Sequence, residues 1–361
     1  MRRLLLITGV FPLRKNPGRG VFVAEQARLL RESGEDVRIV NPLPRLTPMF
    51  HRIRPQFTGV GAAPREGDYE GMAVLRPRFT GLPGGMGAFL SAASVRARAG
   101  GVAAWLGRWR PDIIHLHGIH PVAELGMVLG RDFGCPSVAT VHGWDLDAGL
   151  AGAAGARIRN ALIRLDALAV VSAAQLVTAR SIGVAEERLH LIPCHVEVDA
   201  GRRGEMAPMD SEQRRLRLLF GAHPRRREKD NPLFRAACVE LRGRGWSLEV
   251  DDIRQLSKAE VLERMSAADV VVLTSRREGS PQVLKEALAC GVRVVSTDVG
   301  DASTWLPAAA IASERTPAAV ARAIESAVSL EPSKWMLPER FSAERVLAGL
   351  MAMYASTDSR R

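Results

Sequence analysis

The feature that most constrains the fold of this chain is a repeated alternation of short apolar runs with segments of helical pattern. The chain begins with the run Leu4–Val10, continues with a helical pattern over Val21–Ser33 and returns to an apolar run at Val37–Val40. Gly34 stands where a glycine cap would end the helix. This alternation is typical of βαβ units, in which a helix carries the chain between two parallel strands.

Further apolar runs predict two series of strands and therefore two lobes. The rest of the first series is Met72–Leu75, Ile113–Leu116, Ser137–Val141 and Ala167–Val171. After a run at Leu189–Cys194, the second series is Leu216–Phe220, Leu248–Val250, Val270–Leu273, Val292–Ser296 and Ala309–Ala312. At 361 residues the chain suits two domains of roughly 150 to 200 residues each. We therefore expect an α/β protein with two Rossmann-like, doubly wound lobes.

The domain boundary is expected near residue 197, because the polar segment 200–215 has the character of an interdomain connection. The expected domains are then residues 1–196 and 197–337. A helical pattern over residues 338–354 predicts a closing helix. Residues 355–361 are expected to form a disordered tail.

Composition excludes several classes of protein. Hydrophobic content of 47% and charged content of 25% are typical of soluble globular chains, so disorder is excluded. The four cysteines lack the spacing of a zinc site or of a disulfide framework. No apolar run approaches the roughly 18 to 20 residues that span a bilayer, and the N-terminus lacks a secretory cleavage pattern, so we expect a cytoplasmic protein. The net charge of +11 favours an anionic partner, which leaves nucleic acid, an anionic membrane and a phosphorylated substrate open.

The strongest local signal is the segment Thr274–Gly291, in which an apolar run is followed by a short loop and a helix. Pro281 suits the first helical turn, and Gly291 suits the C-terminal cap. The apolar stripe of this helix is Val283, Ala287 and Cys290. Free backbone amides around Gly279–Gln282 would face the carboxyl edge of a parallel sheet, where they can hold a diphosphate.

Two carboxylates flank this predicted anion site. Glu278 precedes the helix and Glu286 lies about a turn and a half inside it, so the two can address opposite ends of one ligand. Glu286 can accept hydrogen bonds from a ribose diol, and Glu278 can accept them from hydroxyls of a sugar. A sugar nucleotide has this layout, although spacing alone also fits two ordinary solvated carboxylates.

The spacing of Glu278 and Glu286 resembles the E-x7-E motif of family 4 glycosyltransferases, which have the GT-B fold. Other matches to that family extend over nearly the whole chain: Phe11-Pro12, Gly20–Val23, Pro111–Gly118, Thr140–Asp145, Ile192-Pro193 and Val196–Asp199. The resemblance implies two lobes facing a cleft, with a C-terminal helix that returns to the first lobe. It also implies a retaining glycosyltransferase whose first lobe binds the acceptor and whose second lobe binds the nucleotide sugar.

The resemblance further implies roles for individual residues. His142, Glu278 and Lys229 would be catalytic, and cations such as Lys229 would oppose the charge of the leaving diphosphate. Residues that bind the sugar nucleotide would be Gly20, Arg225, Arg226, Lys229, Gly279, Ser280, Pro281, Gln282, Val283 and Glu286. The chain departs from the family near the basic run, where Ala222 stands in place of a frequent arginine and Asp230-Asn231 in place of Lys-Gly. Which of Arg225, Arg226 and Arg227 contacts the diphosphate therefore stays open.

No metal or other cofactor is expected. Asp145 and Asp147 form an Asp-x-Asp pattern, but they follow His142-Gly143 and lack an accompanying carboxylate cluster, so we interpret the pattern as coincidence. The lysine and the helix N-terminus can supply the electrostatic stabilisation instead.

Donor, acceptor and rival functions remain open at this level. Family frequency favours a UDP-sugar, with a GDP-sugar second, and a glycan or lipid-linked acceptor in cell-surface polysaccharide or glycolipid synthesis. A sugar-nucleotide epimerase of the same fold is the first alternative. This chain lacks a recognition motif for nucleic acid, so no nucleic-acid partner is expected. It also lacks the G-x-G-x-x-G pattern of a dehydrogenase.

The arginine-rich stretches Asn41–Gly87 and Phe89–Trp109 suggest peripheral contact with the anionic inner face of the cytoplasmic membrane, or an ordinary core helix.

Overall fold

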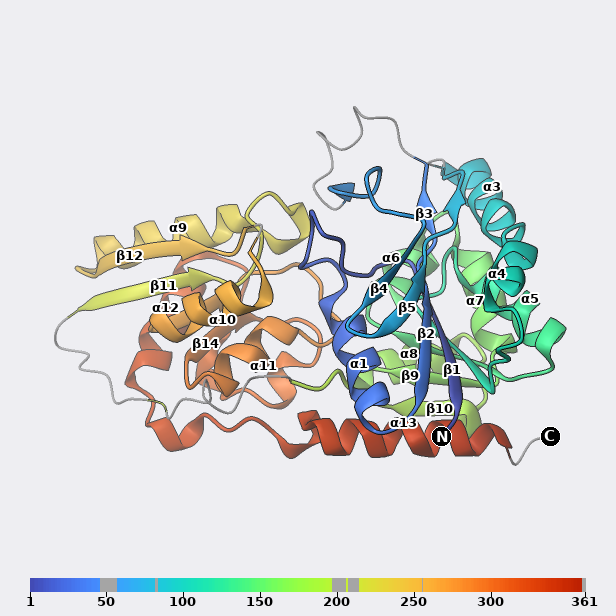
Figure 1. The fold of residues 1–361 in the computed structure, drawn as a ribbon. Coiled ribbons are helices and arrows are strands. Elements are labelled where there is room, and N and C mark those ends of the chain that lie inside the picture. The colour runs from blue at the N-terminus through green and yellow to red at the C-terminus, as the bar shows by residue number, and fades with distance from the viewer. Residues whose placement is uncertain (46–56, 82–83, 197–205, 207–213, 255, 359–361) are drawn as a thin grey trace. The chain divides into compact units, whose positions relative to one another are not determined.

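The structure of the protein, a computed structural model, describes residues 1–45, 57–81, 84–196, 206, 214–254 and 256–358. The chain divides into two units (Figure 1): unit 1 is Met1–Pro193 with Glu344–Arg361, and unit 2 is Cys194–Ala343. The sequence placed the boundary after residue 196. Most of the connection expected at residues 200–215 lies outside the described residues.

Unit 1 is built on a sheet with the strand order β10-β9-β8-β7-β1-β2-β5-β4. Its strands are β1 (Arg3–Thr8), β2 (Asp36–Val40), β4 (Glu66–Tyr69), β5 (Met72–Leu75), β7 (Ile113–His117), β8 (Ser137–Val141), β9 (Ala167–Val170) and β10 (Leu189–Leu191). In the described chain β4 and β5 pair antiparallel, and the other pairs of this sheet are parallel. The predicted parallel sheet is therefore confirmed, and the run Leu189–Cys194 is a strand only as far as Leu191.

Both faces of this sheet are buried. Successive side chains of a strand point to opposite sides, and on each side they belong to an apolar cluster. In β1, Leu5 and Ile7 belong to one apolar cluster, and Leu4 and Leu6 belong to another. The first cluster includes residues of α3 (Gly84–Arg96), α4 (Ala99–Leu106), α5 (Ala123–Phe133), α7 (Gly155–Arg164) and α8 (Ala173–Ser181). The second includes residues of α1 (Val21–Glu32) and α13 (Ala343–Asp358). Strands covered on both faces account for the unbroken apolar runs of the sequence.

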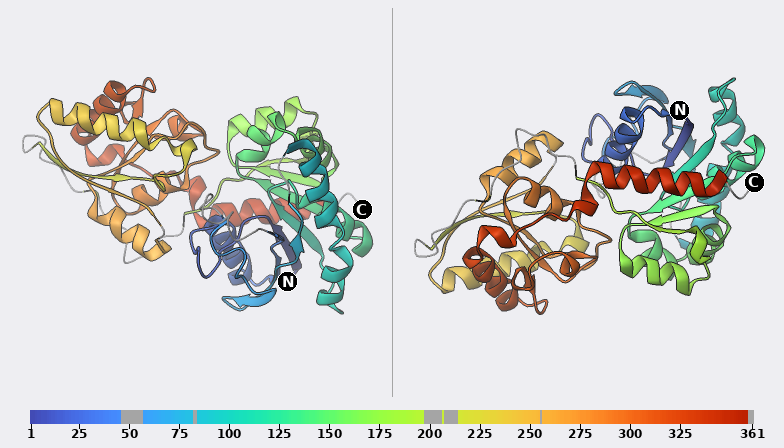
Figure 2. Two further views of the ribbon diagram at one scale, coloured as in Figure 1. Left: turned by 90° about the horizontal axis from the view of Figure 1, so that it is seen from above. Right: turned by 90° about the horizontal axis from the view of Figure 1, so that it is seen from below.

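The C-terminal helix α13 belongs to unit 1 (Figure 2). Its residues Val346, Leu350, Met353 and Tyr354 are buried in the second cluster. The helix starts later than the expected residue 338 and continues to Asp358. The prediction of a disordered tail from residue 355 is therefore wrong for Ala355–Asp358, and residues 359–361 lie outside the described residues.

The segment between residues 41 and 87 contains more strands than its sequence indicated. Beside β5, the described part holds β4 and a small parallel pair, β3 (Leu43–Pro44) with β6 (Arg78–Phe79). β4, with the sequence Glu-Gly-Asp-Tyr, has almost no apolar signal, because it is an exposed edge strand paired on one side only. Residues 46–56 and 82–83 of this stretch lie outside the described residues.

Unit 2 repeats the plan with a parallel sheet of order β12-β11-β13-β14-β15. The strands are β11 (Arg215–Phe220), β12 (Ser247–Asp252), β13 (Val270–Leu273), β14 (Arg293–Thr297) and β15 (Ile311–Ala312). The helices are α9 (Asn231–Gly243), α10 (Lys258–Ala267), α11 (Gln282–Ala289) and α12 (Pro317–Ser329). Contacts pair α9 with α12 and α10 with α11. The strand order reverses at β11, because β12 lies on one side of it and β13 on the other. The loops that follow β11 and β13 therefore lie side by side at the carboxyl edge of this sheet.

Candidate functional site

The turn for which the sequence predicted an anion site lies at the carboxyl edge of the unit 2 sheet. Pro281 is the N-cap of α11, and Gly291 ends the helix with φ 73°, where its amide and that of Val292 bond back to the last turn. Within the described residues no acceptor is found for the backbone N–H groups of Ser280, Gln282 and Val283. Unbonded amides at a helix N-terminus attract an anion.

The tight packing of this turn requires a glycine in the neighbouring loop. Gly300 has φ 62°, and a Cβ there would lie 2.6 Å from the carbonyl oxygen of Gly279. Asp301, which is buried, accepts a hydrogen bond of 2.9 Å from the Ser280 hydroxyl. The loop after β14 therefore packs against this turn and holds it in place, a contact that the sequence did not predict.

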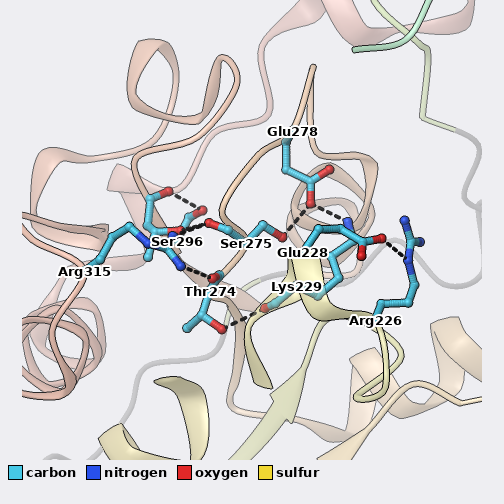
Figure 3. A network of polar contacts seen from close by, with 9 residues as sticks. Arg226, Glu228, Lys229, Thr274, Ser275, Glu278, Ser296 and Arg315 are labelled. Carbon is cyan, nitrogen blue, oxygen red and sulfur yellow. Dashed lines mark hydrogen bonds and ion pairs between the residues drawn. The ribbon is translucent and has the colours of Figure 1, made fainter. Parts of the chain in front are cut away.

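Glu278 lies in a network of polar contacts at the end of β13 (Figure 3). Its Oε1 accepts a hydrogen bond of 2.6 Å from the Ser275 hydroxyl and pairs with the ammonium group of Lys229. The side chains of Glu278 and Lys229 are 16% and 13% exposed, so water screens their interaction only in part. The structure thus brings together two of the three residues for which the sequence suggested a catalytic role.

Glu286 is buried on α11 and pairs with Lys258, the first residue of α10. Its side chain is 10% exposed, which makes an unpaired charge unfavourable. The sequence gave no reason to single out Lys258. The only nearby signal is the capping box of Ser257 and Glu260, which marks the start of a helix but not its neighbour.

The basic loop after β11 is fixed by hydrogen bonds at its C-terminal end, whereas the arginines that precede this end are exposed. The Thr274 hydroxyl lies 3.1 Å from the carbonyl oxygen of Lys229 and 2.9 Å from that of Asp230, which fixes the backbone beside Glu278. Arg226 pairs with Glu228 at 2.7 Å. In the described part of the chain the guanidinium groups of Arg225 and Arg227 have no carboxylate partner, and both residues are exposed. These two arginines are therefore the ones whose charges are uncompensated.

Asp230 connects the loop after β11 to two other loops at the carboxyl edge of the sheet. It has φ 52°, and its carboxylate accepts from Arg315 at 2.7 Å and pairs with Arg276 at 3.0 Å. Arg315 also donates to the carbonyl oxygens of Thr274 and Ser275. The Asp230-Asn231 departure from the family pattern thus provides the anchor of this network. No sequence spacing predicts it, because its members come from three separate loops.

The side chain of Gln282, a predicted nucleotide-sugar contact, is bonded within unit 2. Its amide nitrogen donates to the carbonyl oxygen of His195, and its Oε1 accepts from Lys285 at 3.3 Å. The Lys285 ammonium group is buried over the Phe341 ring at 4.2 Å, and burial lowers the pKa of Lys285. The side chain of Val283 packs near Gly221. In this structure, therefore, Gln282 and Val283 would contribute their backbone N–H groups.

In unit 1, Gly20 begins α1 in a conformation that only glycine adopts easily. Its φ is 65°, and a Cβ would lie 2.6 Å from both the carbonyl carbon and the carbonyl oxygen of Val10. Arg19 bonds to the carbonyl oxygens of Gly9 and Phe11, and burial lowers the pKa of Arg19 to about 10. Gly20 therefore lets the start of α1 approach the Val10 backbone closely, and its predicted contact with the sugar nucleotide stays a prediction.

His142 follows β8 and lies between two rings. The Phe22 ring is 4.4 Å away between centroids, and His142 Nε2 lies 3.1 Å from Nδ1 of His117, at the end of β7. His115, also on β7, contacts the hydroxyl groups of Tyr354 at 2.7 Å and Thr140 at 2.8 Å. Burial lowers the pKa of His115 to about 3 and that of His117 well below its ordinary value. Gly20 and His142, from distant parts of the sequence, are thus joined through Phe22.

The Asp-x-Asp pattern has a structural explanation. Asp145 is buried and accepts a hydrogen bond of 2.9 Å from the Ile119 amide, and burial raises its pKa. The described residues contain no group of three or more His, Cys, Asp and Glu side chains arranged to hold a metal ion. Asp145 therefore stabilises the loop after β7.

Comparison with known proteins shows the family. Residues 18–195 match the family described as "Glycosyl transferase 4-like domain", and residues 209–329 match "Glycosyl transferases group 1". The chain is 26% identical over 333 residues to TuaC of Bacillus subtilis (strain 168), which is assigned to teichuronic acid biosynthesis as a glycosyltransferase. That match covers 84% of this chain and 82% of TuaC.

Solved structures show the same fold at low sequence identity. The catalytic domain of starch synthase IV from Arabidopsis thaliana, bound to ADP and acarbose, has a TM-score of 0.67 at 13% identity, with 99% of each chain covered. Sucrose-phosphate synthase from Thermosynechococcus elongatus has 0.64 at 16%, covering 99% of this chain and 98% of its own. HepE from Anabaena, in complex with UDP and glucose, has 0.63 at 14%, covering 99% and 100%. With two family matches in order along one GT-B chain, the protein belongs to the group 1 glycosyl transferases with a glycosyl transferase 4-like first domain.

Proposed function

We propose that this glycosyltransferase is retaining and moves a hexose from a nucleoside-diphosphate sugar to a glycan or lipid-linked acceptor in the synthesis of a cell-surface polysaccharide or glycolipid. The observation that carries the proposal is the segment Ser280–Val283, where no acceptor is found among the described residues for three backbone N–H groups. In the sequence this segment lies between Glu278 and Glu286, each of which is paired with a lysine. A diphosphate fits the amides. Glu286 then accepts from the ribose hydroxyls, and Glu278 from the saccharide.

A UDP-sugar is the first candidate for the donor and a GDP-sugar the second. HepE, which has the same fold, is described in complex with UDP-glucose as well as with UDP and glucose. TuaC, which is described as a glycosyltransferase of teichuronic acid biosynthesis, supports a place in polysaccharide synthesis.

In the proposed reaction the bond between C1 of the sugar and the phosphate oxygen breaks, and the acceptor oxygen bonds to C1 from the same face. The acceptor hydroxyl proton passes to the departing phosphate. Lys229 and an unpaired arginine, Arg225 or Arg227, oppose the charge that develops on the diphosphate. The proposal needs no metal ion, because these cations and the amides at Ser280 stabilise the leaving group.

Nucleotide binding by the full chain tests the proposal directly. Titration calorimetry with UDP, GDP and UDP-glucose, in buffer containing EDTA, should give saturable binding of at least one nucleotide. Glu286→Gln should weaken that binding about tenfold, since it replaces a charged acceptor by a neutral amide. Glu263→Gln, on the exposed side of α10, is the matched control and should bind like the wild type. Equal binding by Glu286→Gln and wild type, or binding only when a divalent cation is added, would contradict the proposal.

We also propose that the enzyme works in the cytoplasm, in peripheral contact with an anionic membrane. α3 packs Ala88, Ala92 and Val95 into unit 1 and exposes Met86, Phe89 and Leu90. The guanidinium group of Arg157 lies 4.7 Å from the centre of the Phe89 ring, so a cation accompanies the apolar patch. Among the described residues no helix is both long and apolar enough to cross a membrane.

Flotation tests the membrane contact. The full chain should float with vesicles rich in phosphatidylglycerol at low salt and much less with neutral vesicles. A variant with Met86→Ser and Phe89→Ser should lose most of the floated fraction, whereas Met336→Ser, an exposed methionine of unit 2, should not. Failure of the wild type to float at low salt would remove this part of the proposal.

A further inference from the structure

The contact between His117 and His142 constrains where each ring carries its proton. His117 Nδ1 and His142 Nε2 are 3.1 Å apart, and the two ring planes differ by 10°. A hydrogen bond at this distance needs one nitrogen that bears a hydrogen and one that does not. The contact by itself allows either ring to be the hydrogen-bond donor.

The second nitrogen of His117 distinguishes the two arrangements. His117 Nε2 is buried and has no hydrogen-bond partner among the described residues. Buried N–H groups without an acceptor are rarer in proteins than acceptors without an N–H group. Nε2 is therefore the nitrogen without a proton, and Nδ1 of His117 carries the hydrogen. The burial that depresses the pKa of His117 favours the neutral ring.

We propose that His117 is a positioning residue that donates its Nδ1 proton to Nε2 of His142, and so holds His142 neutral with its own proton on Nδ1. The inference rests on the role proposed for His142 at the reacting sugar. On that role, His142 does not take a proton from the acceptor through Nε2, and any hydrogen bond that its ring gives to a saccharide comes from Nδ1. This assignment follows from the partners of the nitrogen atoms.

The surroundings hold the pair in place. The His115 ring stacks on that of His117 at 4.6 Å, and His115 is itself bonded to Tyr354 and Thr140. The Phe22 ring lies against His142. His117 is thus fixed through β7, and it transmits that position to the more accessible ring of His142.

Nitrogen NMR of the full chain tests the assignment without reference to activity. Long-range 1H–15N correlation spectra of 15N-histidine-labelled protein at neutral pH distinguish the two neutral tautomers and the imidazolium ion. The signals are assigned from their loss in His117→Asn and His142→Asn. We expect the Nδ1–H tautomer at both positions. An Nε2–H tautomer at His117, or an imidazolium ion at His142, would overturn the inference.

Three substitutions of His117 separate positioning from packing. His117→Asn places an amide N–H near the position of Nδ1, His117→Gln places one near Nε2, and His117→Phe keeps the ring but no N–H. We expect His117→Asn to keep the Nδ1–H tautomer of His142 and a kcat close to that of the wild type. The Gln and Phe variants should lose the tautomer preference and about tenfold in kcat, with the donor KM unchanged. Equal losses in all three variants would mean that His117 acts only through packing.

The role of His142 at the sugar and the hydrogen bond from His117 can be disproved independently. If His142→Ala leaves turnover unchanged while the wild-type tautomers are as expected, the role of His142 at the sugar is wrong and the hydrogen-bond assignment stands. If the tautomers are reversed, the inference fails even when His142→Ala is inactive. Should one His117 variant not fold, either of the other two assigns the His117 signals, and the wild-type spectrum still decides.

Discussion

Glu278 and Glu286 each have a lysine partner from another segment of unit 2. Lys229 comes from the loop after β11, and Lys258 from the start of α10. Both pairs are largely withdrawn from water, so removal of one partner leaves a charge that neither water nor protein compensates fully. The lysines therefore supply the counter-charges of these carboxylates and fix their orientation as hydrogen-bond acceptors.

Lys258 is expected to matter for nucleotide binding although no sequence motif marks it. Lys258→Met should weaken nucleotide binding severalfold, because the Glu286 carboxylate loses its counter-charge and its fixed orientation. Lys334→Met, in an exposed turn of unit 2, serves as the control for the loss of one positive charge. Titration calorimetry at constant ionic strength measures both. Unchanged affinity in Lys258→Met would show that the ion pair is incidental.

Gly20 and Gly34 allow steric crowding to be separated from backbone strain. Both have positive φ, but a Cβ at Gly20 would overlap the Val10 backbone, whereas nothing lies within 4 Å of a Cβ at Gly34. Gly34→Ala should lower the free energy of unfolding by about 1 kcal/mol, from strain alone. Gly20→Ala should lower it by more than about 2 kcal/mol. Urea unfolding followed by circular dichroism gives both values, and equal losses would contradict the predicted crowding.

At the scale of elements, β7 carries two buried histidines on one face, which makes unit 1 sensitive to acid. In the unfolded chain these rings bind protons near pH 6.5, whereas the pKa of His115 in the native protein is about 3. Between these values the unfolded state holds more protons. The free energy of unfolding therefore falls as the pH is lowered, by about 1.4 kcal/mol per pH unit for each such histidine.

This linkage predicts lower stability at pH 5 than at pH 7. Urea unfolding of the wild type at the two pH values should differ by roughly 2 to 4 kcal/mol. His115→Asn removes one titrating group and should show a smaller difference, whatever its stability at pH 7. Equal stability of the wild type at both pH values would contradict the burial of these rings as neutral groups.

The elements themselves follow from local pattern, with two instructive exceptions. Strands such as β1, β7 and β13 are found within a residue or two of the apolar runs that predicted them. β4 was missed because an edge strand needs no apolar face. The end of α13 was predicted too early, because its last turn contains Ser356, Thr357 and Asp358, whose polarity resembles that of a tail. Thr357 is nevertheless buried, and its hydroxyl donates to the Tyr354 carbonyl oxygen.

At the scale of the whole molecule, the chain returns to unit 1 after completing unit 2. α13 supplies four large buried side chains to one face of the first sheet, and Tyr354 bonds to His115. Unit 1 is therefore complete only when the last helix has been made.

Truncation tests this dependence. A chain ending at Ser342 should fail to fold unit 1, because the lost burial of Val346, Leu350, Met353 and Tyr354 exceeds about 6 kcal/mol, a large part of typical domain stability. A chain ending at Asp358 should fold like the full protein. Circular dichroism and the susceptibility of unit 1 to limited proteolysis report the result. A folded, protease-resistant unit 1 in the shorter chain would contradict the prediction.

The sequence by itself determined what depends on neighbours along the chain: the βαβ alternation, the Pro281 and Gly291 boundaries of α11 and the spacing of Glu278 and Glu286. Periodicity, capping and turn chemistry act over a few residues, so they are legible without a fold. Only the tertiary structure decided the partners: Lys258 on Glu286, the Asp230 anchor with Arg315, and His117 beside His142. These contacts join loops that the strand order places at the same edge of a sheet, and strand order is set by the packing of the whole domain.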